Sequence, residues 1–135
     1  MFSWQAAVLA SFVVALPLMI RTTRASLETV DKDLIKASYT LGRSEFETFF
    51  KISLPLAKRG IYAGAVLSFA RAMGEFGATI MVAGNIPGRT DTMPIAIYSC
   101  AASGDWQKAH IMVALFTVIS AMFLFMANRF SRERV

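Results

Sequence analysis

The sequence predicts an all-α, polytopic membrane protein with about three transmembrane helices, and three observations predict this class. Of the 135 residues, 56% are hydrophobic and the mean hydropathy is +0.52, which exceeds what soluble domains usually show. Apolar runs cover residues 3–20, 61–83 and 109–127, and each is about long enough to cross the hydrocarbon core of a bilayer. Charged and turn-forming residues fill the segments between these runs, so we expect loops over residues 21–59 and 84–106.

The distribution of positive charge predicts the orientation of these spans. Eight of the 14 Lys and Arg residues lie in the first loop, namely Arg21, Arg24, Lys32, Lys36, Arg43, Lys51, Lys58 and Arg59. Three more close the chain, Arg129, Arg132 and Arg134. Positive residues concentrate in cytoplasmic segments, so residues 21–59 and the basic tail should face the cytoplasm and residues 84–106 the exterior. We expect no nucleic-acid partner, because basic residues that bracket apolar spans more often determine topology.

The first apolar run, residues 3–20, can also be interpreted as a signal peptide. A basic segment before it is missing, and Arg21 and Arg24 follow it instead. This order fits a helix that stops at the cytoplasmic face, with Pro17 tolerated inside the membrane. The start of the chain would then lie outside the cell. We therefore expect residues 1–135 to be the C-terminal part of a longer transmembrane domain.

Residues 31–55, which we call the elbow, predict two short helices joined at a glycine. Small and apolar residues recur at helical spacing in the first helix, at Leu34, Ile35, Ala37, Ser38 and Leu41. Gly42 should stop this helix, and Ser44 should cap the next one. The second helix has an apolar face and should be interrupted by Pro55. Such an elbow, held at a membrane surface, is suited to docking.

The second span, residues 61–83, contains an unusual charged pair. Glycines such as Gly60 and Gly64 should let neighbouring helices approach closely. Arg71 and Glu75 are four residues apart, which places both on one face of a helix. Ionised side chains at this depth should face protein or a water-filled cavity. Two interpretations stay open: a mutually neutralising pair that fixes packing, which we favour, and a polar lining of a translocation route.

The external segment, residues 84–106, begins with a turn-rich loop. Its Arg89 alone is weak evidence for an anion site. Thr92–Ser103 is too short to span and should be an interfacial or re-entrant helix, followed by a turn with Trp106 as an interfacial anchor. The lone Cys100 excludes an intrachain disulfide, and His110 has no second metal-binding side chain spaced near it.

Sequence motifs for catalysis are missing. The chain has no Gly-x-x-x-x-Gly-Lys-Ser/Thr phosphate loop, so it should not hydrolyse ATP itself. It also has no spacing that supports a Ser-His-Asp or Cys-His arrangement or a zinc cluster. We expect a non-catalytic protein without a cofactor or metal.

The elbow matches a known family pattern. The spacing Lys36-Ala37-Ser38-x-x-x-Gly42, nine residues, Ile52-x-Leu54-Pro55 resembles the cytoplasmic "EAA" loop of ABC-importer permease subunits, Glu-Ala-Ala-x-x-x-Gly, nine residues, Ile-x-Leu-Pro. Gly42, Ile52, Leu54 and Pro55 fall in register. Lys36 replaces the usual Glu, and Ser38 replaces the usual Ala. Family members carry more membrane helices than are expected here.

A second resemblance concerns the substrate. The run from Phe69 to Ile80, continued by Gly84–Thr90, looks like the oxyanion branch of these permeases, which includes molybdate/tungstate and sulfate/thiosulfate subunits. The segment Thr92–Tyr98 resembles the molybdate branch more closely. The two resemblances cover about residues 30–100. They imply a molybdate or tungstate permease, with a sulfate/thiosulfate permease as the alternative.

The resemblance implies a set of partners and a prokaryotic inner-membrane location. A second permease copy would complete the translocation path as a homodimer, and a periplasmic or extracellular binding protein would deliver the oxyanion. Membrane lipid would surround the spans. A separate cytoplasmic ABC ATPase dimer would hydrolyse ATP and dock on the elbow. The implied coupling residues are Leu34, Ile35, Lys36, Ala37, Ser38, Leu41, Gly42, Ile52, Leu54 and Pro55.

Two other classes of protein stay open. In a membrane assembly or scaffold protein the elbow would be a plain partner-binding helix. In an integral-membrane enzyme the chemistry would rest on Arg71, Glu75 and His110.

Overall fold

A computed structural model of the chain describes residues 3–133, and every regular element in that range is helical. In chain order the elements are α1 (Trp4–Glu28), α2 (Lys32–Thr40), α3 (Glu45–Thr48), the π-helical turn η1 (Phe49–Ser53), α4 (Leu54–Met73), α5 (Gly77–Ala83), α6 (Met93–Ala102) and α7 (Trp106–Glu133). The prediction of an all-α chain is confirmed. Arg134 of the predicted basic tail lies outside the described residues.

Two of the described helices are long and apolar enough to cross a membrane, Trp4–Glu28 and Trp106–Ala127. A third span results if the helix Glu45–Met73 and α5, which meet at a bend of 59°, are counted together. The expected three spans agree with this upper count. The chain is therefore a polytopic, all-helical protein of the kind that the apolar runs predict.

The first helix extends further than expected. We predicted a stop near Arg21, but α1 continues to Glu28. Arg24 donates to Glu28 one turn later, with 2.8 Å between Nε and Oε1, and an ion pair of this spacing supports a helix. No glycine or proline stands between Arg21 and Glu28 to end the helix.

The second span is not the single helix that we predicted over residues 61–83. Its helix begins before residue 61 and is broken after Met73, where Gly74 forms the C-terminal cap. The chain then turns through Glu75 and Phe76 before α5 starts at Gly77. Glycines at both ends of this break lower the cost of leaving the helix.

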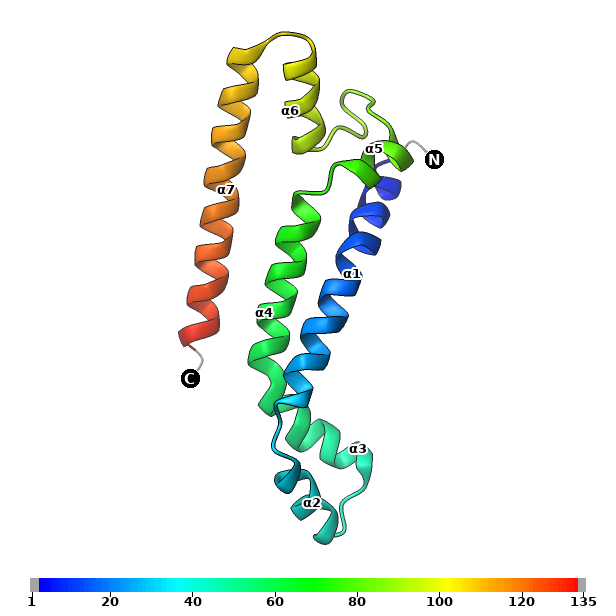
Figure 1. The fold of residues 1–135 in the computed structure, drawn as a ribbon, viewed down its shortest axis with the longest axis vertical. Helices are drawn as coiled ribbons and strands as arrows, with labels where there is room; N and C mark the ends of the chain where they lie inside the picture. The colour runs from blue at the N-terminus through cyan, green and yellow to red at the C-terminus, as the bar shows by residue number, and fades with distance from the viewer. Residues whose placement is uncertain (1–2, 134–135) are drawn as a thin grey trace.

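Helices α1 and α4 lie side by side and antiparallel, and they form the packed centre of the fold (Figure 1). A Cβ atom added to Gly64 would lie 2.2 Å from Thr22 Oγ1, and one added to Gly60 would lie 2.1 Å from Ser26 Oγ. Both hydroxyls donate to carbonyls of their own helix. The predicted close approach is therefore confirmed, because only glycine fits opposite these hydroxyls.

The remaining elements occupy the two ends of this pair. The elbow lies beyond one end, and α5 lies at the other (Figure 1). There the hydroxyl oxygens of Thr79 and of Ser11 in α1 lie 3.2 Å apart. Helices α6 and α7 form an antiparallel hairpin. The predicted short helix at residues 92–103 is observed as α6, whereas Trp106 starts α7 and does not belong to the turn. Asp105 caps α7, and the hydrogen bond from the Lys108 side chain lowers the pKa of its carboxyl.

Replacing Gly64 tests the α1–α4 contact. In Gly64→Ala the new methyl group must push Thr22 away, so we expect a loss of about 1–3 kcal/mol of stability. The measurement is thermal unfolding of the purified full-length protein in detergent. Gly74→Ala is the matched control, because its added Cβ meets nothing closer than 3.9 Å. An equal drop in Tm for both variants would contradict the contact.

Candidate functional site

The first arm of the elbow, α2, has well-defined ends. Asp31 caps its start by accepting a hydrogen bond from the Asp33 amide at 2.8 Å. At its end the Gly42 amide donates to the Tyr39 carbonyl at 2.9 Å and the Arg43 amide to the Ser38 carbonyl at 3.2 Å. This pair of bonds is a Schellman motif, and Gly42 takes the φ of +79° that it requires. The predicted stop at Gly42 is confirmed.

The second arm begins as predicted but does not end as predicted. Ser44 Oγ accepts a hydrogen bond from the Glu47 amide at 3.3 Å, so the predicted cap is confirmed. The prediction that Pro55 interrupts this helix is wrong. The chain passes from α3 through η1 into α4, and the Leu54 amide bonds to the Phe49 carbonyl five residues back. The wide π turn gives the proline ring room, since Pro55 sits in the first turn of α4.

The second arm and the second span therefore form one continuous helical segment from Glu45 to Met73, which we call the rod and which changes direction between α3 and α4 (Figure 1). The helical hydrogen bonding passes through η1 into α4, so α3 is joined to α4 by helix and not by a loop. The end of this rod lies at the break before α5, next to Glu75.

The predicted coupling residues of α2 divide between two faces. Ser38 is buried and Ile35 half-buried, and α2 contacts α3 and η1. Leu34, Ala37 and Leu41 are exposed at a spacing of three and four residues, so they form an outward stripe. Leu41 is 81% exposed.

The other predicted coupling residues lie along the outer surface and at the root of the elbow. Lys36 is exposed and pairs with Asp33 of its own helix at 3.2 Å. Ile52 and Leu54 are half-buried, and Pro55 is exposed. On the second arm, Phe46 is 79% exposed. We call Leu34, Leu41, Phe46 and Phe50, all exposed, the apolar tip of the elbow.

Sequence reasoning missed one contact inside the elbow. Ser38 Oγ and Thr48 Oγ1 lie 2.8 Å apart in the interior of the elbow. Thr48 carries no motif of its own, and only the folding of α2 onto α3 brings it to Ser38. The replacement of the family's alanine by Ser38 was the one available signal.

Arg71 and Glu75 meet as predicted, although not on one helix. Arg71 Nη1 lies 2.8 Å from Glu75 Oε2, but Glu75 stands in the break after α4. Its other oxygen, Oε1, accepts a hydrogen bond from the Ala78 amide at 3.0 Å and so caps α5. Glu75 is buried, whereas the Arg71 side chain is half exposed. Both carboxylate oxygens thus have donors within this chain.

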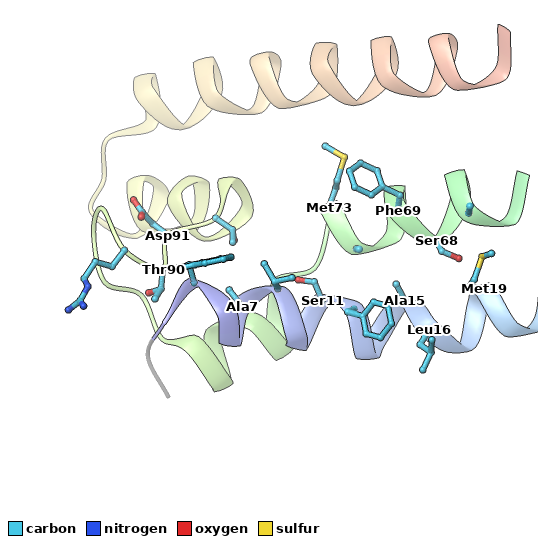
Figure 2. Close-up of a pocket in the computed structure, with 17 residues that line it drawn as sticks. Ala7, Ser11, Ala15, Leu16, Met19, Ser68, Phe69, Met73, Thr90 and Asp91 are labelled. Atoms are coloured by element: carbon cyan, nitrogen blue, oxygen red, sulfur yellow. The ribbon is translucent and has the colours of Figure 1, made fainter. Parts of the chain in front are cut away.

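A groove of about 600 Å³ runs between α1, α4 and the loop before α6 (Figure 2). Its wall is mainly apolar, with Ala7 and Ala15 on one side and Phe69 and Met73 on the other. Such a wall suits a hydrated oxyanion poorly. Arg89 belongs to the lining while Arg71 and Glu75 do not, so the structure does not bring the three charges together there.

Among residues 3–133 the structure shows no group of three or more His, Cys, Asp or Glu side chains that could hold a metal ion. His110 is exposed, and its ring Nδ1 contacts the Trp106 carbonyl one turn earlier. The His110 ring also lies beside the Trp106 ring. Nothing in this geometry joins His110 to Arg71 or Glu75.

Comparison with known proteins gives consistent matches. The model of the family described as "Binding-protein-dependent transport system inner membrane component" matches residues 1–134. The chain is 43% identical, over 99% of its length, to the molybdenum transport system permease protein ModB of Haemophilus influenzae, and covers 58% of that protein. It is 47% identical, over 92% of its length, to the putative molybdenum transport system permease protein YvgM of Bacillus subtilis, and covers 55% of it.

A sulfate protein matches at lower identity. The chain is 31% identical, over 99% of its length, to the sulfate transport system permease protein CysT of Escherichia coli, and covers 50% of it. The chain thus spans 50–58% of the length of these three curated relatives.

Replacing Gly42 tests the turn of the elbow. Gly42→Val must adopt a positive φ with a β-branched side chain, which costs at least about 1–2 kcal/mol, so the Schellman bonds should open more often. We expect roughly tenfold faster hydrogen exchange at the Arg43 amide. Gly42→Asn is the matched control, because asparagine tolerates this conformation. Equal exchange in the two variants would contradict the role assigned to Gly42.

Replacing Glu75 tests the bend. Glu75→Ala removes the acceptor for the Ala78 amide and the partner of Arg71, so we expect a loss of about 1–3 kcal/mol of stability. Glu75→Gln keeps an oxygen for Ala78 and should lose less than half as much. Thermal unfolding of the full-length protein measures both. If the two variants lose the same stability, the bond to Ala78 does not hold the bend.

Proposed function

The chain belongs to the family of binding-protein-dependent transport system inner membrane components, and we propose that it acts as a permease subunit of an ATP-driven importer for molybdate or tungstate. The observation that carries this proposal is the elbow, whose apolar tip is exposed and whose second arm continues into α4 without a break. A non-catalytic subunit needs this combination, because a separate ATPase must transmit its motion to the membrane helices.

The elbow is the docking site for the ATPase in this proposal. Leu34 and Leu41 would enter an apolar groove of the ATPase, with Phe46 beside them. Lys36, exposed on α2 near this surface, would offer a positive charge where the family usually has Glu. The elbow would face the cytoplasm, in agreement with the basic residues of segment 21–59, and the loop between α5 and α7 would face the exterior.

Transport would follow from motion of the rod that joins the elbow to the bend. ATPases that close on ATP would pull α2, and the rod Glu45–Met73 would carry the displacement to the break at Glu75. Two permease copies in a multi-pass, inner-membrane homodimer would enclose the path and alternate between inward-open and outward-open arrangements. Arg71 and Glu75 serve packing in this scheme, because each already has its partner.

The substrate assignment rests on the relatives. The Haemophilus influenzae and Bacillus subtilis proteins named for molybdenum transport match at 43% and 47% identity, and the Escherichia coli sulfate protein matches at 31%. A sulfate/thiosulfate permease is therefore the second candidate. An external binding protein would supply specificity, so the permease itself needs no tight oxyanion site.

Uptake into vesicles tests this function. The full-length subunit is reconstituted with its ATPase and binding protein, and labelled molybdate competes with excess tungstate or excess sulfate. We expect ATP-dependent uptake that tungstate suppresses and sulfate does not. Suppression by sulfate would move the assignment to the sulfate branch, and no ATP-dependent uptake would favour a scaffold protein.

A matched pair of variants tests the coupling in the same vesicles. Gly42→Pro should abolish uptake, because proline cannot adopt a φ of +79° or donate to the Tyr39 carbonyl. Gly42→Asn should retain it. Uptake that survives in Gly42→Pro would contradict the coupling role. Loss of uptake in Glu75→Gln, with ATPase binding retained, would instead favour a polar functional centre at Arg71 and Glu75.

A further inference from the structure

The two arms of the elbow are joined by one buried pair of hydroxyls. Ser38 of α2 is 2% exposed and Thr48 at the end of α3 is 1% exposed, and their oxygens lie 2.8 Å apart. Ten residues and the Gly42 turn separate them along the chain. Neither hydroxyl has access to water, so each depends on the other or on a carbonyl of its own helix.

Ser38 is tied to the far side of the turn twice. Its carbonyl accepts the hydrogen bond from the Arg43 amide that closes the Schellman motif, and its side chain pairs with Thr48. One residue of α2 therefore fixes both the backbone of the turn and the position of the second arm.

Other side-chain bonds within the elbow do not cross between the arms. Lys36 pairs with Asp33 inside α2, and Lys51 pairs with Glu47 inside the second arm. Thr40 donates to the Ala37 carbonyl of its own helix. Among the described side chains of residues 31–55, the bond between Ser38 and Thr48 is the one that connects the two arms.

We propose that Ser38 and Thr48 are positioning residues for energy coupling, an inference that rests on the proposed function. Their hydrogen bond locks α2 against α3, so that a pull on α2 reaches the rod and is not absorbed by rotation at Gly42. A glycine with φ of +79° and open space around it is a natural hinge. Loss of such a hydrogen bond, worth about 1 kcal/mol, lowers the ratio of elbows with α2 held against α3 to elbows with α2 released by roughly fivefold.

Variants that separate the hydroxyl from the shape of the side chain test this inference. Thr48→Val keeps the shape and removes the hydroxyl, whereas Thr48→Ser keeps the hydroxyl and removes a methyl group. In the reconstituted vesicles the readout is oxyanion taken up per ATP hydrolysed. We expect this ratio to fall roughly fivefold in Thr48→Val and in Ser38→Ala, and to stay within about twofold of wild type in Thr48→Ser.

The double variant Ser38→Ala/Thr48→Val shows whether the two residues act as a pair. Because the bond is already lost in either single variant, we expect the double variant to be no worse than the single ones. Thr40→Val, which removes an exposed hydroxyl from the same helix, is the matched control and should leave the ratio unchanged. The amount of protein in the membrane and co-purification of the ATPase are measured alongside, because a fault in folding or docking would lower these as well.

Three results would overturn the inference. The first is an uptake ratio in Thr48→Val that equals that of wild type. The second is a fall in Thr48→Ser as large as that in Thr48→Val. The third is a double variant in which the losses of the two single variants add. A wild-type subunit without ATP-dependent uptake would instead refute the proposed function, and the inference with it. Wild-type uptake with an unchanged ratio in Thr48→Val would refute only the role of the pair.

Discussion

The close contact between α1 and α4 is the constraint on which the rest of the fold depends. At Gly60 and Gly64 the backbone of α4 approaches Ser26 and Thr22 more closely than any side chain at the glycines would permit. In a membrane, where burial against lipid gains little, such close packing is a main source of helix association. The contact holds two long helices antiparallel, so that the elbow emerges at one end and α5 folds against α1 at the other.

Much of this fold could be predicted because its signals are local. Runs of apolar residues identify the spans, and Gly42 and Ser44 each act through hydrogen bonds to residues at most a few positions away. The prediction failed where a local rule has a structural exception. Pro55 normally ends a helix, but the π turn at Phe49–Ser53 accommodates its ring and the helix continues.

The candidate site was predictable only in part, because its contacts link segments that are distant along the chain. The spacing of Arg71 and Glu75 predicted their ion pair, yet their helix breaks between them and Glu75 also caps α5. No periodicity could pair Ser38 with Thr48, since that contact exists only once α2 has folded back on α3. The folding of α2 onto the second arm also divides the stripe expected on α2: Ser38 and Ile35 face inward, whereas Leu34, Ala37 and Leu41 are exposed.

The continuous helix from Glu45 to Met73 connects the elbow to the far end of the second span. The long part of this helix, α4 with its 20 residues, is about 30 Å long, so a tilt of only about 5° moves its far end by about 3 Å. Helix shifts of about 1–2 Å already suffice to switch many packed interfaces. A partner that tilts this helix only slightly at the elbow therefore displaces its far end enough to change the packing there.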